Sequence, residues 1–252
     1  RPGHADFTYD ARYGFRDYRG GGRSSGRETA GRVASGAVAA IALQAMGIGF
    51  TTYVSAIGPV ECDPSRFDEE FILKNPLCMP DEEAYGKAAA YLEECRAAGD
   101  SSGGTVTCIV RGVPAGVGNP VFDKLDADLA KAMFSIGAVK GFEIGEGCNA
   151  ARLKGSENND PFTGNSTPES IATATNHCGG ILGGISTGGD IVMRVHFKPT
   201  PSISMEQETV DRTGHPTKIK IAGRHDPIIA PRAAVVVETM AAATLLDAIL
   251  SR

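Results

Sequence analysis

The chain lacks tryptophan and is poor in aromatic residues, which make up 6% of its 252 residues. It also lacks a long hydrophobic run, because the longest unbroken apolar stretch is the seven residues Ala37 to Leu43. A membrane-spanning helix needs about 20 such residues. No charged-then-apolar signal segment opens the chain. We therefore expect no membrane association and a cytoplasmic protein.

Metal-binding and disulfide patterns are also missing. No two cysteines form a C-x-x-C pair or zinc-finger spacing, and no two histidines have H-x-H or H-x-x-x-H spacing. A chain of this size does not depend on disulfides. We expect no metal site and reduced thiols at all six cysteines: Cys62, Cys78, Cys95, Cys108, Cys148 and Cys178.

Positive charge is scarce overall but concentrated at the start of the chain. The net charge is −5, which argues against nucleic-acid binding. Residues 1–32 nevertheless hold seven arginines, no lysine and four acidic residues, a local charge of +3. Arginine without lysine favours bidentate recognition of carboxylates or phosphates. A small anionic ligand is thus a better fit than a nucleic acid.

Glycine is the abundant residue: the chain has 32, where average usage gives about 18. In an aromatic-poor globule, this excess is typical of backbone held close to a ligand or to other backbone. The remaining composition is that of an ordinary globular domain. Because the chain begins with Arg1 rather than methionine, we expect a fragment or a processed product.

Hydrophobic spacing predicts mixed helices and strands in one domain, α/β or α+β. A capping box at Ser25–Glu28 opens a helix through about Met46, with one apolar face for packing against a neighbour. That face carries Val33, Ala37, Val38 and Ile41. Further helices are predicted over 82–97, 119–136 and 231–250. The apolar spacing of the second includes Phe122 and Leu125. The core candidates of the third are Val235, Val236, Met240 and Ala243. Strands are predicted over 50–57, 105–111, 139–144, 191–197 and 218–221, and a long loop over 153–190.

A glycine- and arginine-rich segment, Arg19–Glu28, runs directly into the first predicted helix. Glycine lets backbone N–H groups turn inward, and a helix N-terminus attracts anions. The segment is not a Walker A loop, because no Gly-Lys-Ser/Thr follows at the required spacing. It is either an anion cradle or a flexible turn before an ordinary helix.

Two other segments combine polar groups with restrained backbone. Gly179–Gly188 is followed by a predicted strand rather than a helix, so it is not a Rossmann fingerprint. It is either backbone packed against a flat ligand or a plain turn. Lys198–Ser202 places lysine, threonine and serine among prolines at a strand end. That string either holds a phosphate or simply ends the strand.

Two candidates for acid–base chemistry stand at opposite ends of the chain. His4 lies between Arg1 and Asp6, and an imidazole near an anion site suits general acid catalysis. It could equally be an ordinary surface or core histidine. Arg224-His225-Asp226 is an acid–base cluster or a solvated charged loop.

Four strings, in this order, resemble chorismate synthase: Arg1–Asp6, Tyr13–Thr29, Gly179–Ser186 and Arg224–Arg232. The resemblance implies an α+β fold, a compact β-α-β sandwich forming a single domain over residues 1–252, assembled as a homotetramer. It also implies a lyase that converts 5-enolpyruvylshikimate 3-phosphate to chorismate and phosphate by 1,4-elimination. Reduced FMN would be required without net redox change, with NADPH if the enzyme reduces its own flavin.

Carried over position by position, the resemblance makes His4 the acid that protonates reduced FMN and Asp226 a proton shuttle. The expected FMN contacts are Arg23, Ser24, Ser25, Gly137, Ala138, Gly183, Lys198, Pro199, Thr200, Pro201, Ser202 and Arg224. The expected substrate contacts are Arg1, His4, Arg27 and Arg224. Gly137 stands where the family commonly has asparagine, so one side-chain contact differs there.

The family's upstream Gly-Glu-Ser-His-Gly motif, with a second catalytic histidine, does not occur in these 252 residues. We therefore expect an N-terminally truncated domain that is inactive alone. A non-catalytic flavin- or anion-binding module is the alternative.

Overall fold

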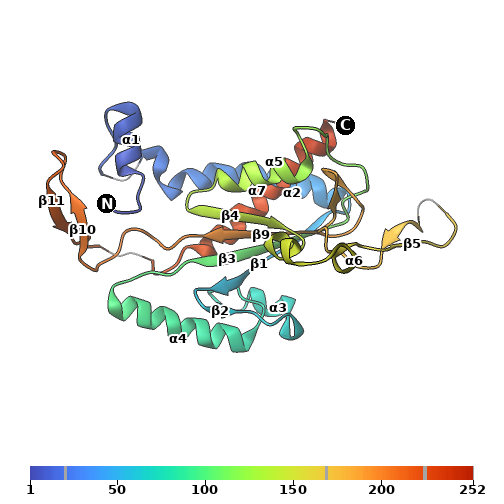
Figure 1. The fold of residues 1–252 in the computed structure, drawn as a ribbon, viewed down its shortest axis with the longest axis horizontal. Coiled ribbons are helices and arrows are strands. Elements are labelled where there is room, and N and C mark those ends of the chain that lie inside the picture. The colour runs from blue at the N-terminus through green and yellow to red at the C-terminus, as the bar shows by residue number, and fades with distance from the viewer. Residues whose placement is uncertain (20–21, 168–169, 224–225, 252) are drawn as a thin grey trace.

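A five-stranded antiparallel sheet forms the centre of the computed structural model, which describes residues 1–19, 22–167, 170–223 and 226–251 (Figure 1). The strand order is β2-β1-β3-β9-β4. The bounds are β1 Gly49–Ile57, β2 Val60–Glu61, β3 Gly104–Arg111, β4 Val139–Ile144 and β9 Ile191–Phe197. Four of these strands were predicted from the sequence, and only the two-residue β2 was not.

The register of β9 explains why one face of the sheet is apolar. Its residues alternate between buried and half-exposed positions, starting with buried Ile191. Val195 pairs with Val106 and Met193 with Cys108 of β3, and all four side chains are fully buried. Successive side chains on a strand point to opposite faces, so this row faces the helices.

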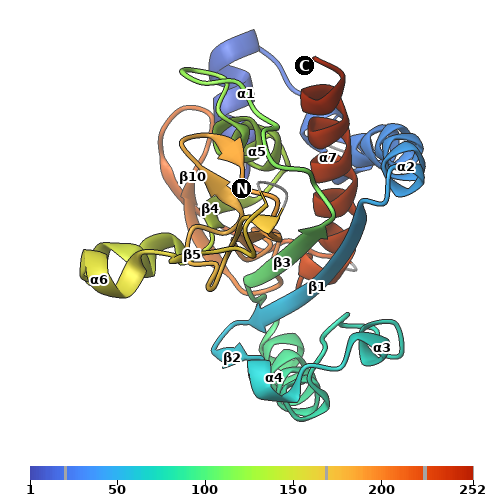
Figure 2. The ribbon, with the colours of Figure 1, turned by 90° about the vertical axis from the view of Figure 1, so that its right-hand side faces the viewer.

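Three helices cover that apolar face (Figure 2). Helix α7, Ala230–Leu250, packs on β1 and β3, and α5, Leu125–Phe134, packs on β4. Helix α2, Thr29–Ala45, packs on α7. By length and composition alone α7 could cross a membrane. Here it is the central core helix, with Val237, Ala241 and Leu245 fully buried.

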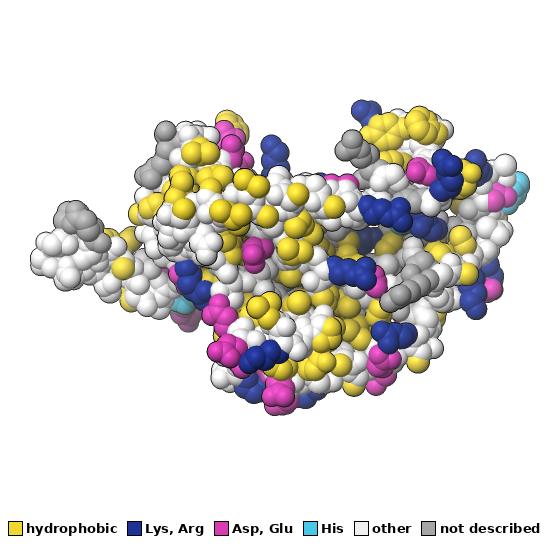
Figure 3. Space-filling model, turned by 180° about the vertical axis from the view of Figure 1, so that it is seen from behind, with side chains coloured by type: hydrophobic (Ala, Val, Ile, Leu, Met, Phe, Trp, Pro, Cys, Tyr) yellow, Lys and Arg dark blue, Asp and Glu magenta, His cyan; other side chains and the backbone are white. Residues whose placement is uncertain are grey.

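The close contact of α2 with α7 corrects the predicted face of α2. Its buried residues are Gly36, Ala39 and Leu43, whereas Val38 and Ile41 are each 69% exposed. A Cβ on Gly36 would lie 2.2 Å from the Thr239 carbonyl oxygen. The backbones approach so closely that the smallest residues occupy the contact. Hydrophobic side chains therefore gather on the surface over the helices (Figure 3).

The predicted start of α5 was also wrong. The helix begins at Leu125, and Asn119 instead forms an isolated bridge with Asp123. Phe122, expected on the buried face, is 91% exposed. In α7, Val235 is 49% exposed, whereas Val236 is buried.

The remaining elements lie around this core. Helix α4, Glu82–Ala98, packs on β2. The predicted loop 153–190 holds a short helix and two small hairpins. The hairpins β5–β6 and β10–β11 extend from opposite ends of the molecule (Figure 1). The bounds are α1 Asp6–Tyr13, α3 Glu69–Ile72, α6 Gly155–Asn158, β5 Phe162–Thr163, β6 Ala172–Thr173, β7 Ile181–Leu182, β8 Ile185–Ser186, β10 Gln207–Val210 and β11 Pro216–Ile219. The domain as a whole is compact, with mixed helices and strands.

Helix α4 begins at a buried carboxylate, Asp81, whose side chain is 0% exposed. It accepts backbone hydrogen bonds from Glu83 at 3.0 Å and Ala84 at 3.2 Å, and Arg66 donates to it at 2.7 Å. These Arg66 hydrogen bonds hold the pKa of the Asp81 carboxyl well below its usual range. Asp81 therefore ties the loop before α4 to the helix N-terminus.

We predict that Asp81→Ala lowers the free energy of unfolding by about 2–4 kcal/mol, through the lost cap and the broken ion pair. Glu82→Ala, in the same turn but exposed, should change it by less than about 0.5 kcal/mol. Folding depresses the Asp81 pKa, so its contribution is full above the unfolded value of about 4 and is lost as the pH falls further. Urea unfolding at pH 7 and pH 3 should show the difference between wild type and Asp81→Ala shrinking in acid. An equal difference at both pH values would contradict this assignment.

Candidate functional site

The N-terminal loop packs on the segment that follows β9, at one end of the sheet. The Lys198 ammonium donates to the Gly3 carbonyl, and Arg1 Nη1 donates to Ser202 Oγ at 3.3 Å. A Cβ on Gly3 would lie 3.3 Å from Pro201 Cβ. The fold thus brings together two strings about 200 residues apart that the sequence analysis singled out separately.

The turn between α5 and β4 joins the same end of the sheet. The Lys198 N–H donates to the Ala138 carbonyl at 3.0 Å, next to the pairing of Val139 with Phe197. Gly137 precedes this contact and is exposed. Two of the predicted cofactor-contact segments, Gly137–Ala138 and Lys198–Ser202, are therefore contiguous with each other and with the N-terminal loop.

Lys140 is a cation at this end that the sequence analysis missed. It is exposed and stands at a bulge in β4, where the register shifts between Val139 and Gly141. Burial and the positive charge of Lys140 lower the pKa of Lys198. Neither lysine has an ion pair with a carboxylate of the described residues. Two ammonium groups without a carboxylate partner attract an anion. In the sequence, the only indication of a role for Lys140 was its position next to the turn at Gly137 and Ala138.

The segment Lys198–Ser202 contains a polar atom without a partner. Thr200 Oγ1 is buried and has no hydrogen bond with any described residue. The backbone carbonyl of Thr200 accepts a hydrogen bond from Ser101 Oγ at 2.7 Å. An unsatisfied buried hydroxyl costs free energy unless a ligand or water completes it. With the two lysines, it fits a ligand that carries a phosphate.

His4 lies against a buried ion pair. Arg1 Nε and Nη2 donate to the Asp6 carboxylate at 2.7 and 2.9 Å, and His4 Nδ1 is 2.9 Å from Asp6 Oδ1. The Arg1 hydrogen bonds hold the pKa of the Asp6 carboxyl well below its usual range. Burial, followed by the charge of Arg1, lowers the pKa of His4. His4 is thus neutral near pH 7 and is positioned by a carboxylate.

The arginines predicted to bind substrate differ in their partners. The Arg1 charge is balanced by Asp6, and only Nη1 extends toward Ser202. Arg27 is exposed, and its guanidinium makes no ion pair or hydrogen bond with any residue in the part of the chain that the structure describes. Arg27 is therefore the more available of the two for an anion. Arg224 lies outside the described residues, as does the side chain of Arg23.

The predicted anion cradle precedes α2 as two short 3₁₀ turns. Ser24 ends the first turn, Gly22–Ser24, and Ser25 Oγ accepts from the Arg27 N–H at 3.3 Å. Ser25 thus caps a 3₁₀ turn, whereas α2 begins at Thr29 without a side-chain cap, so the predicted capping box does not form. The Glu28 carboxylate pairs with Arg32 at 2.9 Å.

Arg32 also fixes where this segment lies. Its Nη2 donates to the Ser135 carbonyl at 3.1 Å. Ser135 ends α5 and precedes Gly137 by two residues. The start of α2 is therefore at the same end of the sheet as Gly137 and Ala138.

Asp226 lines a polar cavity of about 470 Å³. Ser202, from the segment that contacts the N-terminal loop, lines the same cavity. The Asp226 carboxylate is 2.7 Å from Arg232 Nη1. Asp226 and Ser202 thus border one space.

Gly183 lies away from the end of the sheet where the other predicted contacts meet. It forms the turn of the β7–β8 hairpin, and the neighbouring Gly184 carbonyl accepts from the Leu125 N–H at 2.9 Å. Leu125 begins α5, whereas Gly137 follows the other end of that helix. The expected strand after the glycine-rich string is confirmed, since β9 follows it. The single chain does not bring Gly183 to the other predicted contacts.

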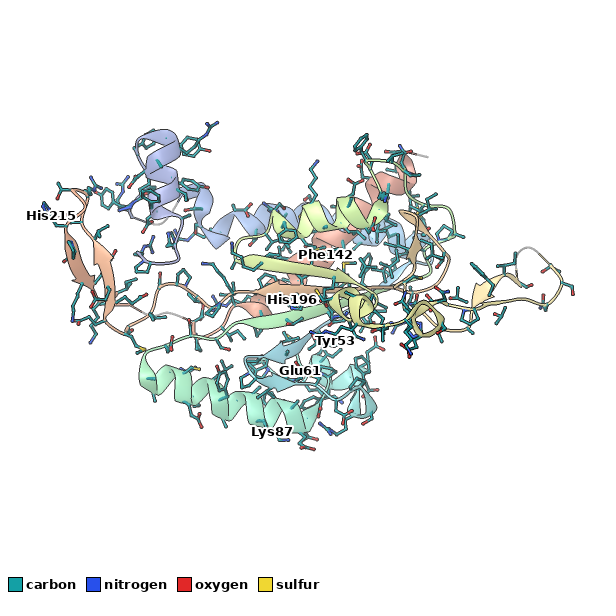
Figure 4. The ribbon with its side chains drawn as sticks, in the orientation of Figure 1. Tyr53, Glu61, Lys87, Phe142, His196 and His215 are labelled. Atoms are coloured by element: carbon teal, nitrogen blue, oxygen red, sulfur yellow. The ribbon has the colours of Figure 1, made fainter. Side chains whose placement is uncertain are left out.

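Three further histidines are described, and Figure 4 labels two of them. His215 is on the turn side of the β10–β11 hairpin, 2.7 Å from Thr213 Oγ1, and His177 lies 3.0 Å from Asp160. His196 is on β9, with Nδ1 3.0 Å from Thr105 Oγ1. It pairs with Gly141 and so lies at the same end of the sheet as the predicted contact segments, whereas His4 is the histidine that the resemblance makes catalytic. All six cysteines are free thiols.

Comparisons with known proteins give one family. The family model described as chorismate synthase matches residues 1–250. A chorismate synthase of Lachnoclostridium phytofermentans is 61% identical over 251 residues, covering 100% of this chain and 68% of that protein. One from Methanosarcina barkeri is 56% identical, covering 98% and 68%. A crystal structure of chorismate synthase aligns with a TM-score of 0.79 at 32% identity, covering 98% of this chain and 69% of that one.

The contact of Gly3 with Pro201 can be tested with a matched pair. Gly3 and Gly14 both have left-handed φ values, +69° and +75°, but a Cβ on Gly14 would meet nothing within 4 Å. Both alanine variants should lose about 1–2 kcal/mol from backbone strain. Only Gly3→Ala should also move the loop away from Pro201, and it should then weaken binding of the FMN expected from the resemblance by roughly fivefold. Urea unfolding and a flavin fluorescence titration measure the two effects. Equal flavin affinities for the two variants would exclude the loop contact from ligand binding.

Proposed function

The chain belongs to the chorismate synthase family, a family of lyases, and we propose that it converts 5-enolpyruvylshikimate 3-phosphate to chorismate and phosphate with reduced FMN. The observation that carries this proposal is the convergence at one end of the sheet. His4, the turn at Ala138 and Lys198–Ser202 come from distant parts of a chain that matches the family over its whole length.

The residues at this end fit an FMN phosphate. Lys198 and Lys140 supply uncompensated positive charge, and Thr200 Oγ1 is a buried hydroxyl without a partner among the described residues. We propose that these groups hold the phosphate and that Ala138 and Ser202 border the remainder of the cofactor. When bound, reduced FMN supplies the electron density that helps the substrate phosphate to leave. NADPH would be a further ligand only if the enzyme reduces its own flavin.

Arg27 is our first choice for a substrate anion. The substrate carries two carboxylates and a phosphate, and a guanidinium fork matches either group. Arg27 offers such a fork, exposed just before α2. Arg1 contributes through Nη1, while its ion pair with Asp6 mainly orders the loop that carries His4.

His4 and Asp226 are the proposed proton-transfer groups. His4 Nδ1 lies against Asp6, so Nε2 is the atom at which His4 holds or releases a proton. Asp226 borders the cavity that Ser202 also lines. Both groups therefore lie beside the segment proposed to bind FMN.

We predict that His4→Ala in the complete enzyme reduces kcat by about 10²–10⁴-fold, the usual contribution of a positioned acid or base. Lys87→Ala, on α4 at a distance from this site (Figure 4), is the control and should leave kcat unchanged. Chorismate formation with excess reduced FMN is the assay. Unchanged turnover of His4→Ala would remove His4 from the mechanism.

The 252-residue polypeptide itself tests the reaction against a flavin-binding module. We propose that it binds FMN but releases little phosphate from the substrate, because the second histidine expected from the resemblance is not among its residues. The complete enzyme should release phosphate together with chorismate. Flavin binding without any substrate-dependent phosphate release by the complete enzyme would favour the non-catalytic module. Rapid turnover by the 252 residues would refute the need for that histidine.

Assembly as a homotetramer in the cytoplasm is part of the same proposal. Its support is the match of residues 1–250 to the chorismate synthase family. Light scattering on the purified complete enzyme measures the assembly directly, and a monomeric mass would contradict it.

A further inference from the structure

The carboxylate of Asp6 is the described group that fixes the orientation and protonation of His4. Its side chain is 11% exposed, and Oδ1 lies 2.9 Å from His4 Nδ1. Asp6 begins helix α1, one residue after the turn that carries His4. The sequence placed Asp6 beside His4 but gave it no role, because its hydrogen bonds with Arg1 and His4 are seen only in the folded loop.

The proton on His4 must lie between Nδ1 and Asp6. An ionised carboxylate only accepts hydrogen bonds, so a lone pair on Nδ1 facing it at this distance would be repelled. Arg1 Nη2 also lies 3.2 Å from Nδ1. A guanidinium only donates, and Nη2 has two N–H groups, one of which is directed to Asp6 at 2.9 Å. The other competes for Nδ1 at the longer distance, but an unprotonated Nδ1 would still face the ionised carboxylate at 2.9 Å. The carboxylate therefore decides the tautomer, Nδ1–H with Nε2 unprotonated.

Arg1 keeps the Asp6 carboxylate ionised. It donates through two nitrogens, and Arg16 Nη1 approaches the same carboxylate at 3.8 Å. These cations hold the pKa of the Asp6 carboxyl well below its usual range, with the Arg1 hydrogen bonds as the main cause. Asp6 is thus ionised near neutral pH and acts as a hydrogen-bond acceptor toward His4.

We infer that Asp6 is the positioning residue of His4, holding a proton on Nδ1 so that Nε2 is the reacting nitrogen. This inference rests on the role proposed for His4 above. When the imidazolium gives up the Nε2 proton, the Nδ1–H remains bonded to Asp6. One proton leaves and the ring becomes neutral, so charge and protons balance. The same carboxylate stabilises the imidazolium when Nε2 is protonated again.

The groups that face His4 set its response to pH. Arg1 contributes its guanidinium and α-amino group, and Asp6 contributes its carboxylate. On the other side of the loop, Lys198 is held at the Gly3 carbonyl. Burial and the Arg1 charge lower the His4 pKa, and Asp6 opposes them. Removing the Asp6 charge should therefore shift the His4 pKa still lower.

The first test reads the tautomer without any assay of activity. Protein labelled with ¹⁵N-histidine has five side chains to resolve, and the loss of one signal in His4→Gln assigns His4. In wild type above the His4 pKa, two-bond ¹⁵N–¹H correlations should show a protonated Nδ1. An Nε2–H tautomer would overturn the inference, whatever the enzyme's turnover.

The second test changes the carboxylate in the complete enzyme. Asp6→Asn should lower kcat by about 10²-fold, change KM little and move the alkaline limb of the kcat/KM profile to lower pH, because His4 acts in its protonated form. Asp6→Glu should restore part of the rate. Asp10→Asn, on the same helix and paired with Arg16 at 3.5 Å, is the matched control and should match wild type.

The outcomes separate this inference from the proposed function. If Asp6→Asn leaves both the His4 tautomer and the pH profile unchanged, Asp6 does not position His4. If the tautomer depends on Asp6 but His4→Ala keeps full turnover, the positioning stands and the proposed catalytic role of His4 fails. Should Asp6→Asn not fold, the wild-type tautomer alone decides.

Discussion

The ion pair between Arg1 and Asp6 is the interaction on which the candidate site depends. It has two short hydrogen bonds and is largely shielded from solvent. Such a pair is costly to desolvate, and it persists where its geometry and further hydrogen bonds compensate. Here the pair adds contacts to His4 and Ser202. A loop of a few residues is thereby fixed against the end of the sheet, in the geometry that acid–base chemistry requires.

The sheet determines which segments can meet at that end. Antiparallel pairing places the end of β9 beside the start of β4, so the Lys198 string and the Ala138 turn must be neighbours. The helices that cover the apolar face of the sheet set the distances between the turns at its two ends. Helix α5 separates Gly183 from Gly137 by its whole length. Rigid elements thus carry the loops, which is the usual arrangement for binding and catalytic residues.

The cationic side chains at this end of the sheet fall into two groups, those paired with a carboxylate and those without such a partner. Arg1 and Arg16 are compensated by Asp6 and serve the structure of the loop. Lys198, Lys140 and Arg27 have no carboxylate partner among the described residues. Uncompensated charge beside a buried hydroxyl without a partner is poorly satisfied in the protein alone. The second group is therefore where an anionic ligand gains most, and it contains a residue, Lys140, that has no motif of its own.

The sequence by itself determined the four long strands of the central sheet, the four longest helices and the family. Alternation in 191–197 and capping at Ser25 and Asp81 depend on neighbouring residues, so local patterns reveal them. The buried face of α2 could not be predicted in this way. The apolar residues Val38 and Ile41 are exposed, whereas Gly36 is buried because α7 approaches so closely. The start of α5 was misplaced for a similar reason, since the apolar Phe122 continues the helical spacing but lies in a turn region. Only the tertiary structure could bring Ser202 to Arg1 in the loop that carries His4, because a contact across some 200 residues leaves no periodicity in the sequence.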